Sequence, residues 1–92
     1  MTNFEATPRL YKELADELLR EINDLNYLSS VIELEFDEHL IIFTFTVMVY
    51  RNELGQITDI IPIWWECDTY NQYSDRCSND VSFSELKKYA MR

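Results

Sequence analysis

The chain has 92 residues, a single-domain length with room for one hydrophobic core. Its composition, 47% hydrophobic and 27% charged, is typical of a packed globular domain and excludes a disordered tail. Seventeen acidic residues against eight basic residues give a net charge of −9, which disfavours direct binding to nucleic acid or to an anionic membrane.

No signal for export or membrane insertion is recognisable. The segment Met1 to Glu5 lacks the basic start and apolar core of a secretory signal. The longest apolar run is too short to cross a bilayer as a helix. The sequence therefore predicts a cytoplasmic protein, and in that reducing compartment Cys67 and Cys77 are expected to be free thiols.

The first predicted element is an amphipathic helix over residues 8–25. Residues 1–6 are interpreted as a loose lead-in, and Thr7-Pro8 is a typical helix start, a hydroxyl N-cap followed by proline. Large apolar residues recur every four positions from Leu10 to Ile22, with charged residues on the opposite side. The helix is therefore expected to pack its apolar stripe against a sheet.

Two strands are predicted after this helix. Val31 to Asp37 alternates apolar and acidic residues, and Asp37-Glu38-His39 is expected to form a turn. Leu40 to Tyr50 is apolar almost throughout, which is typical of a central strand. Its odd-numbered side chains are the bulkier ones and are assigned to the core, whereas its even-numbered side chains form a second face.

A third strand is predicted from Ile57 to Glu66, after a turn closed by Gly55, the only glycine. Regular alternation places Ile57, Ile61, Ile63 and Trp65 on one face, and Ile60 and Trp64 on the other. Pro62 has no amide hydrogen, so this strand is expected either to be an edge or to carry a bulge nearby.

The remaining chain is predicted to end in a short helix. Residues 67–80 are interpreted as a long polar loop, or as a loop that contains a fourth short strand. Ser82 and Glu85 have the spacing of a capping box, and Val81 and Leu86 that of a hydrophobic staple, before a helix over residues 83–91.

The expected fold is thus a single α+β domain over residues 1–92. It contains an N-terminal helix, a three-stranded antiparallel meander that a short fourth strand could extend, and a short C-terminal helix, with both helices on one sheet face.

No residue pattern predicts a catalytic, cofactor or metal site. A single glycine excludes the Gly-rich nucleotide-binding loops, and His39, Cys67 and Cys77 lack the paired spacing of zinc ligands. A row of carboxylates on an exposed strand face is more typical of a solvated or partner-facing surface than of a catalytic pair. The chain is therefore predicted not to be an enzyme and to bind no small molecule. A small hydrolase or metal-dependent enzyme around His39 is kept as a second alternative to the functions described below.

The even-numbered sheet face is the predicted interaction surface, unless a loop or the C-terminal helix covers it. Exposed apolar patches on small proteins mark interfaces, and residues 31–66 carry seven acids and one base. The candidate contact residues are Trp64, Met48, Tyr50 and Ile60, and the candidate residues for long-range attraction are Glu33, Glu35, Asp37 and Glu38.

Two functions of different classes fit this surface. The favoured hypothesis is a protein-interaction module that forms a homodimer through the second sheet face or an edge strand and offers its acidic surface to a basic protein. The alternative is a nucleic-acid mimic that inhibits a basic DNA- or RNA-binding protein, which requires the carboxylates to form a continuous band.

Two segments, Ile61-Pro62-Ile63-Trp64-Trp65-Glu66 and Phe83-Ser84-Glu85-Leu86-Lys87-Lys88-Tyr89, resemble small uncharacterised proteins of gut Bacteroides-type bacteria that are often associated with mobile elements. The resemblance covers the last third of the chain. It implies a bacterial cytosolic origin and carries over no catalytic residues.

Overall fold

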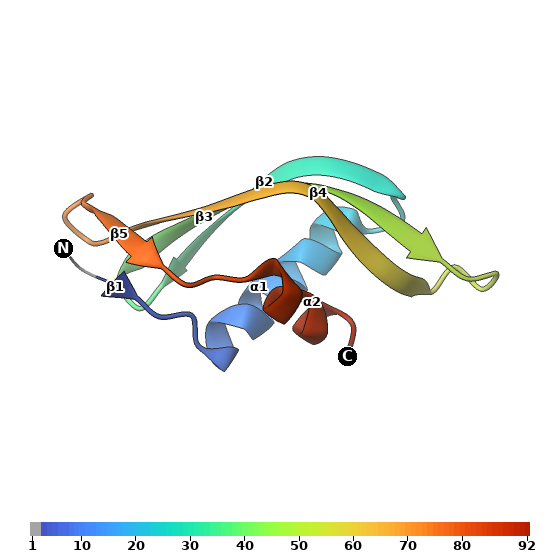
Figure 1. Ribbon diagram of the computed structural model, residues 1–92, viewed down its shortest axis with the longest axis horizontal. Coiled ribbons are helices and arrows are strands. Elements are labelled where there is room, and N and C mark those ends of the chain that lie inside the picture. Colours follow the sequence, from blue (N-terminus) through green and yellow to red (C-terminus); the bar gives the residue numbers. More distant parts are fainter. Residues whose placement is uncertain (1–2) are drawn as a thin grey trace.

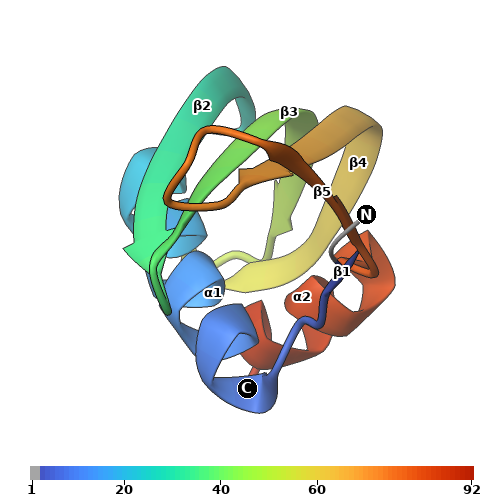
Figure 2. The same ribbon diagram turned by 90° about the vertical axis from the view of Figure 1, so that its left-hand side faces the viewer.

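The computed structural model describes residues 3–92 and shows a strongly curved sheet that arches over two helices (Figures 1 and 2). The elements are β1 (Asn3–Phe4), α1 (Pro8–Ile22), β2 (Tyr27–Phe36), β3 (His39–Arg51), β4 (Ile57–Tyr70), β5 (Arg76–Asn79) and α2 (Phe83–Ala90). Both helices lie on the concave face of the sheet, as predicted (Figure 1). No helix within these residues has the length and apolar character needed to cross a bilayer.

The sheet has five strands in the order β1-β5-β4-β3-β2, and it is mixed because β1 runs parallel to β5. The prediction of three or four strands was therefore too low, although the α+β class is correct. The segment 67–80 is not a single loop: β4 continues to Tyr70 against the long β3, and β5 pairs with its end. Backbone pairing with β3 and with β1 overrides the low strand propensity of Asp68 and Asn79.

The segment before α1 is ordered, contrary to the prediction of a loose lead-in. Phe4 is buried, and its ring meets that of Phe36 edge to face at 6.3 Å. The amide of Ala6 donates to the Asp80 carboxylate at 2.7 Å. Residues 1 and 2 lie outside the described part of the chain. The N-terminal segment is thus held against the strand that precedes α2.

Helix α1 begins where the sequence predicts and ends three residues earlier. The Thr7 hydroxyl accepts from the amide of Leu10 at 3.2 Å, which is the expected N-cap. Asn23 adopts a positive φ of 48° and stops the helix. The guanidinium of Arg51 then donates to the carbonyls of Asn23 and Leu25, so it satisfies acceptors beyond the helix end.

Both hairpin turns of the meander contain residues with a positive φ. Asp37 and Glu38 have φ of 49° and 62°, which is typical of a two-residue type I′ turn, and His39 is already the first residue of β3. Gly55 has φ of 80° in the β3–β4 turn, as predicted. The Asn52 carboxamide accepts from two amides of that turn and fixes it.

The core lies between the concave sheet face and the two helices. The odd-numbered side chains of β3 from Ile41 to Val49 are at most 5% exposed, as predicted, and the apolar stripe of α1 packs against them. Trp65 packs beside this core, with ring centroids 6.0 Å from Phe43 and 6.2 Å from Phe83. The concave face of the sheet therefore supplies the strand residues of the hydrophobic core.

Strand β4 contains a bulge that reverses part of its predicted alternation. Val47 pairs with Pro62 and Thr46 pairs with Trp64, so Ile63 is an extra residue without a partner in the ladder. Both features predicted for Pro62 are present: the bulge lies beside it, and the outer side of β4 is paired only at Thr69 and Tyr70, so β4 is an open edge at Pro62.

The bulge explains why the prediction for Ile60 was wrong. Ile60 pairs with Val49 on the core face and is fully buried, whereas Ile61 pairs with Met48 on the opposite face. The extra residue shifts the alternation by one position, so Ile60 and Ile61 face the opposite way from the regular pattern. A second register shift opposite Tyr50 and Arg51 returns Ile57 to the predicted core side.

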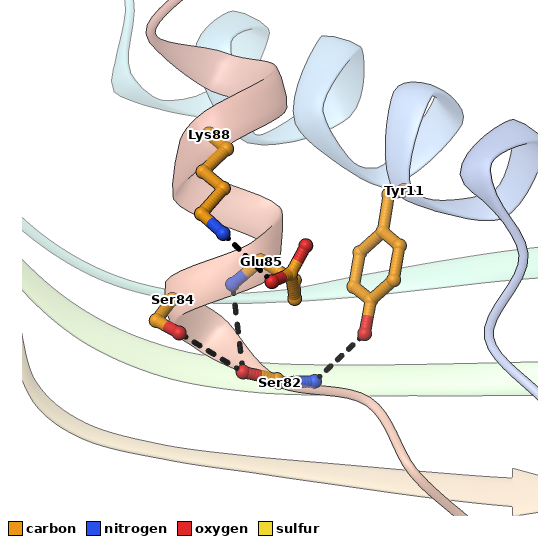
Figure 3. Close-up of polar contacts among 5 residues, drawn as sticks. All are labelled: Tyr11, Ser82, Ser84, Glu85 and Lys88. Atoms are coloured by element: carbon orange, nitrogen blue, oxygen red, sulfur yellow. Dashed lines mark hydrogen bonds and ion pairs between the residues drawn. The ribbon is translucent and has the colours of Figure 1, made fainter.

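Helix α2 begins at the junction with α1 shown in Figure 3. The Ser82 hydroxyl accepts from the Glu85 amide at 3.4 Å, which is the predicted half of the capping box. The other half is replaced: the Ser82 amide donates to the Tyr11 hydroxyl at 3.1 Å, and the Glu85 carboxylate pairs with Lys88. The N-terminus of α2 is therefore anchored to α1.

Candidate interaction surface

The convex face of the sheet carries an apolar patch that we define by Tyr27, Met48, Tyr50, Ile61 and Trp64. The strand register places Tyr27, Met48 and Ile61 in one row across three strands, and Trp64 in the next row beside Thr46. Trp64 is 51% exposed and Tyr27 is 59% exposed. Neither α2 nor the segment 67–80 covers them, so the covered alternative is wrong for residues 3–92.

Three of the predicted contact residues, Trp64, Met48 and Tyr50, come together in this patch. Ile60 does not, because the bulge turns it into the core. Tyr27 and Ile61 were not predicted to belong to it. Tyr27 could have been found by continuing the alternation of β2 backwards through Ser29, whose hydroxyl lies 2.8 Å from that of Thr46 across the strands.

The bulge adds a further exposed apolar side chain beside the patch. Ile63 follows Pro62 and precedes Trp64, and it is 55% exposed. A branched aliphatic side chain at such an exposure next to a tryptophan enlarges the apolar area that a partner could bury. Each further apolar side chain in the area adds surface whose removal from water favours association.

Four carboxylates of the convex face lie toward the other end of the sheet. Glu33 and Glu35 project from β2, and Glu66 and Asp68 project from β4. β3 runs between the two pairs and contributes apolar or hydroxyl side chains there, so the pairs are separated by two strand spacings, about 10 Å. On this face the carboxylates do not form the continuous band that nucleic-acid mimicry requires.

The other two predicted acidic residues lie in the β2–β3 turn. Asp37 pairs with Arg9 at 2.7 Å, and the Arg9 guanidinium also lies over the Phe36 ring at 4.6 Å. Glu38 is exposed at the turn. The predicted acidic and aromatic residues therefore do not form a single site. Asp37 and Glu38 lie in the turn, Glu33 and Glu35 lie on the edge strand β2, and the aromatic residues lie in the apolar patch.

His39 is not placed for catalysis with Cys67. Its Nδ1 atom lies 2.6 Å from the Asp37 carbonyl oxygen, and its ring packs 4.8 Å from that of Phe4. Cys67 pairs with Phe43, four residues further along β3, which corresponds to about 13 Å along the strand. The two side chains therefore cannot form a nucleophile–base pair in this arrangement.

The thiols have the character of packed side chains. Neither Cys67 nor Cys77 forms a disulfide within residues 3–92. Burial, aided by the neighbouring Asp68 carboxylate, raises the pKa of the Cys67 thiol to about 12, so the thiol stays protonated and weakly nucleophilic near neutral pH. Within residues 3–92, no three histidine, cysteine, aspartate or glutamate side chains are grouped closely enough to hold a metal ion.

Comparisons with known proteins return no relative: no family model, no curated protein and no solved structure matches the chain. The functional argument therefore depends on the surface itself.

Proposed function

We propose that the protein is a non-enzymatic interaction module that forms a homodimer through the apolar patch of its convex sheet face. The observation that supports this is the exposure of aromatic and aliphatic side chains on a face that no element of residues 3–92 covers. Patches of this makeup are the usual contact regions of protein interfaces, and tryptophan and tyrosine are the residues that contribute most to binding.

A second copy of the chain suits the patch because its defining side chains carry no charge. A symmetric dimer brings the same surface of each protomer together, so an apolar patch is complementary to itself. Glu35 pairs with Leu40 and Glu33 with Ile42, eight and six residues from Met48 along β3, or about 26 and about 20 Å. A two-fold axis that passes through Met48 perpendicular to the strands places the acidic ends of the two protomers at opposite ends of the dimer, so repulsion between those ends is small.

In this proposal the acidic surfaces stay free in the dimer and attract a basic protein in the cytoplasm. Charges of this kind increase the rate and selectivity of encounter more than the final affinity. The dimer interface and the acidic surfaces are therefore separable by mutation.

Sedimentation velocity tests the proposed dimer. Trp64→Glu places a charge in the patch and is expected to convert a concentration-dependent dimer into a monomer. Leu54→Glu is the matched control, because Leu54 is 83% exposed in the β3–β4 turn outside the patch, and it is expected to leave the dimer intact.

Two results contradict the proposal. One is a wild-type chain that stays monomeric at every concentration while a Trp65→Phe variant, whose tryptophan fluorescence comes from Trp64 alone, is quenched freely by a soluble quencher. The other is a Trp64→Glu variant that keeps the dimer while its circular dichroism is unchanged.

A further inference from the structure

Strand β2 forms an open edge of the sheet along all ten of its residues. It pairs with β3 on one side, and within residues 3–92 no strand pairs with its other side. The amide of Val49 donates to the carbonyl of Asn26 at 2.8 Å, which sets the phase of the ladder. In an antiparallel ladder alternate residues exchange these bonds, so the N–H and C=O groups of the odd-numbered residues point away from the sheet. Those residues are Tyr27, Ser29, Val31, Glu33 and Glu35.

The backbone of this edge has none of the irregularities that usually prevent another strand from pairing with a sheet. β2 contains no proline, no glycine and no register shift. Strand β4, whose outer side is paired only near Tyr70, carries Pro62 and the bulge at Ile63, which are typical protective features. The β2 edge, which is open along its whole length, thus differs from the partly open outer side of β4, and β2 is the strand that can accept a partner.

Helix α1 places a row of carboxylates beneath the β2 edge. The helix runs antiparallel to the strand: Arg9 pairs with Asp37 beyond one end of β2, and Glu21 accepts from the Ser30 hydroxyl at 2.6 Å near the other. Glu13 and Glu17 occupy the same helix stripe, at the four-residue spacing, and lie beside Leu34 at a shallow hollow. An added strand would therefore have carboxylates along its concave side.

The acidic character of this edge is not neutralised by its bases. Arg9 and Arg20 are each paired with a carboxylate, those of Asp37 and Glu17. Within the described residues Glu13 has no ion-pair partner, and neither do Glu33 and Glu35 on the convex side of the same edge. Negative charge thus faces an incoming strand from both of its sides.

We propose that the β2 edge binds an extended segment of a partner protein that is rich in lysine or arginine, as an additional antiparallel or parallel strand. The backbone groups of the odd-numbered residues would supply the hydrogen bonds, and the carboxylates above and below the edge would select basic side chains. This surface is distinct from the apolar patch of the proposed dimer, with only Tyr27 in common.

A second copy of the chain does not fit the same edge. Two copies paired through β2 would bring their α1 carboxylate rows, Glu13, Glu17 and Glu21 in each copy, against one another. Like charges held side by side disfavour association. The edge therefore rejects self-pairing and accepts a strand of opposite charge, so the edge-strand route to a homodimer is not the one we propose.

The test uses the intact chain and two synthetic ten-residue peptides, one alternating lysine with threonine and one alternating glutamate with threonine. The lysine peptide is expected to bind, to weaken as salt rises, and to slow amide hydrogen exchange at the odd-numbered residues of β2. The glutamate peptide is expected not to bind. A lysine peptide that leaves those amides as exchangeable as before would overturn the proposal, because strand addition must protect them.

Charge variants separate the edge from general attraction to an acidic protein. Glu13→Gln with Glu17→Gln is expected to weaken peptide binding about fivefold at low salt, since each partly exposed pair contributes modestly. The control Glu53→Gln with Asp75→Asn removes the same charge from the β3–β4 and β4–β5 turns and is expected to change little. Equal weakening by both pairs contradicts the proposal. Trp64→Glu is expected to leave peptide binding intact, so failure of the dimer and failure of this site are distinguishable.

Discussion

The thiol of Cys67 lies on the core side of β4, opposite Phe43, and its surroundings decide its chemistry. A thiolate there would lose most of its hydration and would face the neighbouring Asp68 carboxylate, so the pKa is raised from its ordinary value of 9.0 to about 12. An exposed cysteine in an acidic chain would be a modest nucleophile; this one is kept protonated by the fold.

This raised pKa predicts a loss of stability at high pH. Above about pH 9 the unfolded chain releases the Cys67 proton while the native chain keeps it, so the free energy of unfolding falls as pH rises toward about 12. The slope from this group stays below about 1.4 kcal/mol per pH unit. Urea unfolding of wild type and Cys67→Ala at about pH 8 and about pH 10.5 is expected to show the difference between the two proteins shrinking with pH. A constant difference would contradict it.

Single residues also set the starts of both helices and the β3–β4 turn, and these are the positions that the sequence identifies best. Thr7, Gly55 and Ser82 act through bonds or backbone conformations within a few residues of themselves, so their roles are visible without the rest of the fold. The reciprocal half of the Ser82–Glu85 capping box is absent because Tyr11, distant in sequence, accepts from the Ser82 amide instead. Local patterns predict local partners and miss such substitutions.

At the scale of the element, the bulge in β4 determines which side chains are core and which are surface. Regular alternation predicted that Ile61 and Ile63 face the core and that Ile60 faces away. The extra residue reverses this for Ile60 and Ile61 and leaves Ile63 exposed. One inserted position therefore moves an isoleucine out of the predicted binding surface and brings another into it.

Alanine substitutions measure this assignment directly. Ile60→Ala is expected to lower the free energy of unfolding by about 2–4 kcal/mol, because it leaves a cavity beside Val49 in the core. Ile63→Ala is expected to change it by less than about 0.5 kcal/mol, since the side chain is largely in solvent. Chemical denaturation of both variants gives the comparison. A larger loss of stability for Ile63→Ala than for Ile60→Ala would contradict the bulge and favour the regular alternation.

At the scale of the whole molecule, the two ends of the chain are joined through the sheet. β1 pairs with β5, and Phe4 buries its ring against Phe36 and His39 at the far end of β2 and β3. In Figure 2 this short strand lies beside β5 at one end of the arch. The first residues thus help to hold the segment that leads into α2.

Removing the Phe4 ring tests whether this closure stabilises the fold. Phe4→Ala is expected to lower the free energy of unfolding by about 2 kcal/mol, the transfer free energy of a buried aromatic side chain. Asn3→Ala is the control, because Asn3 is exposed in the same strand, and it is expected to have little effect. Equal and negligible effects in thermal denaturation would show that the segment is only a lead-in.

The curvature of the sheet is what leaves the convex face uncovered. Both helices fit beneath the arch, so the apolar residues of the concave face are buried and those of the opposite face stay in contact with water (Figure 1). The proposed dimer and the proposed binding edge both follow from this arrangement, since two helices on one face leave the other face and the β2 edge without cover.

The sequence by itself determined the α+β class, the amphipathic α1, the core face of β3, both tight turns and the start of α2. Each of these depends on a periodic pattern of apolar residues, or on a capping or turn residue that affects only its neighbours in the sequence. The tertiary structure decided the remaining features: β1, β5, the extension of β4, the reversal at Ile63 and the uncovered convex face. These depend on pairing between segments far apart in the chain, where the backbone of a neighbouring strand can order Asp68 or Arg76 regardless of their own preferences.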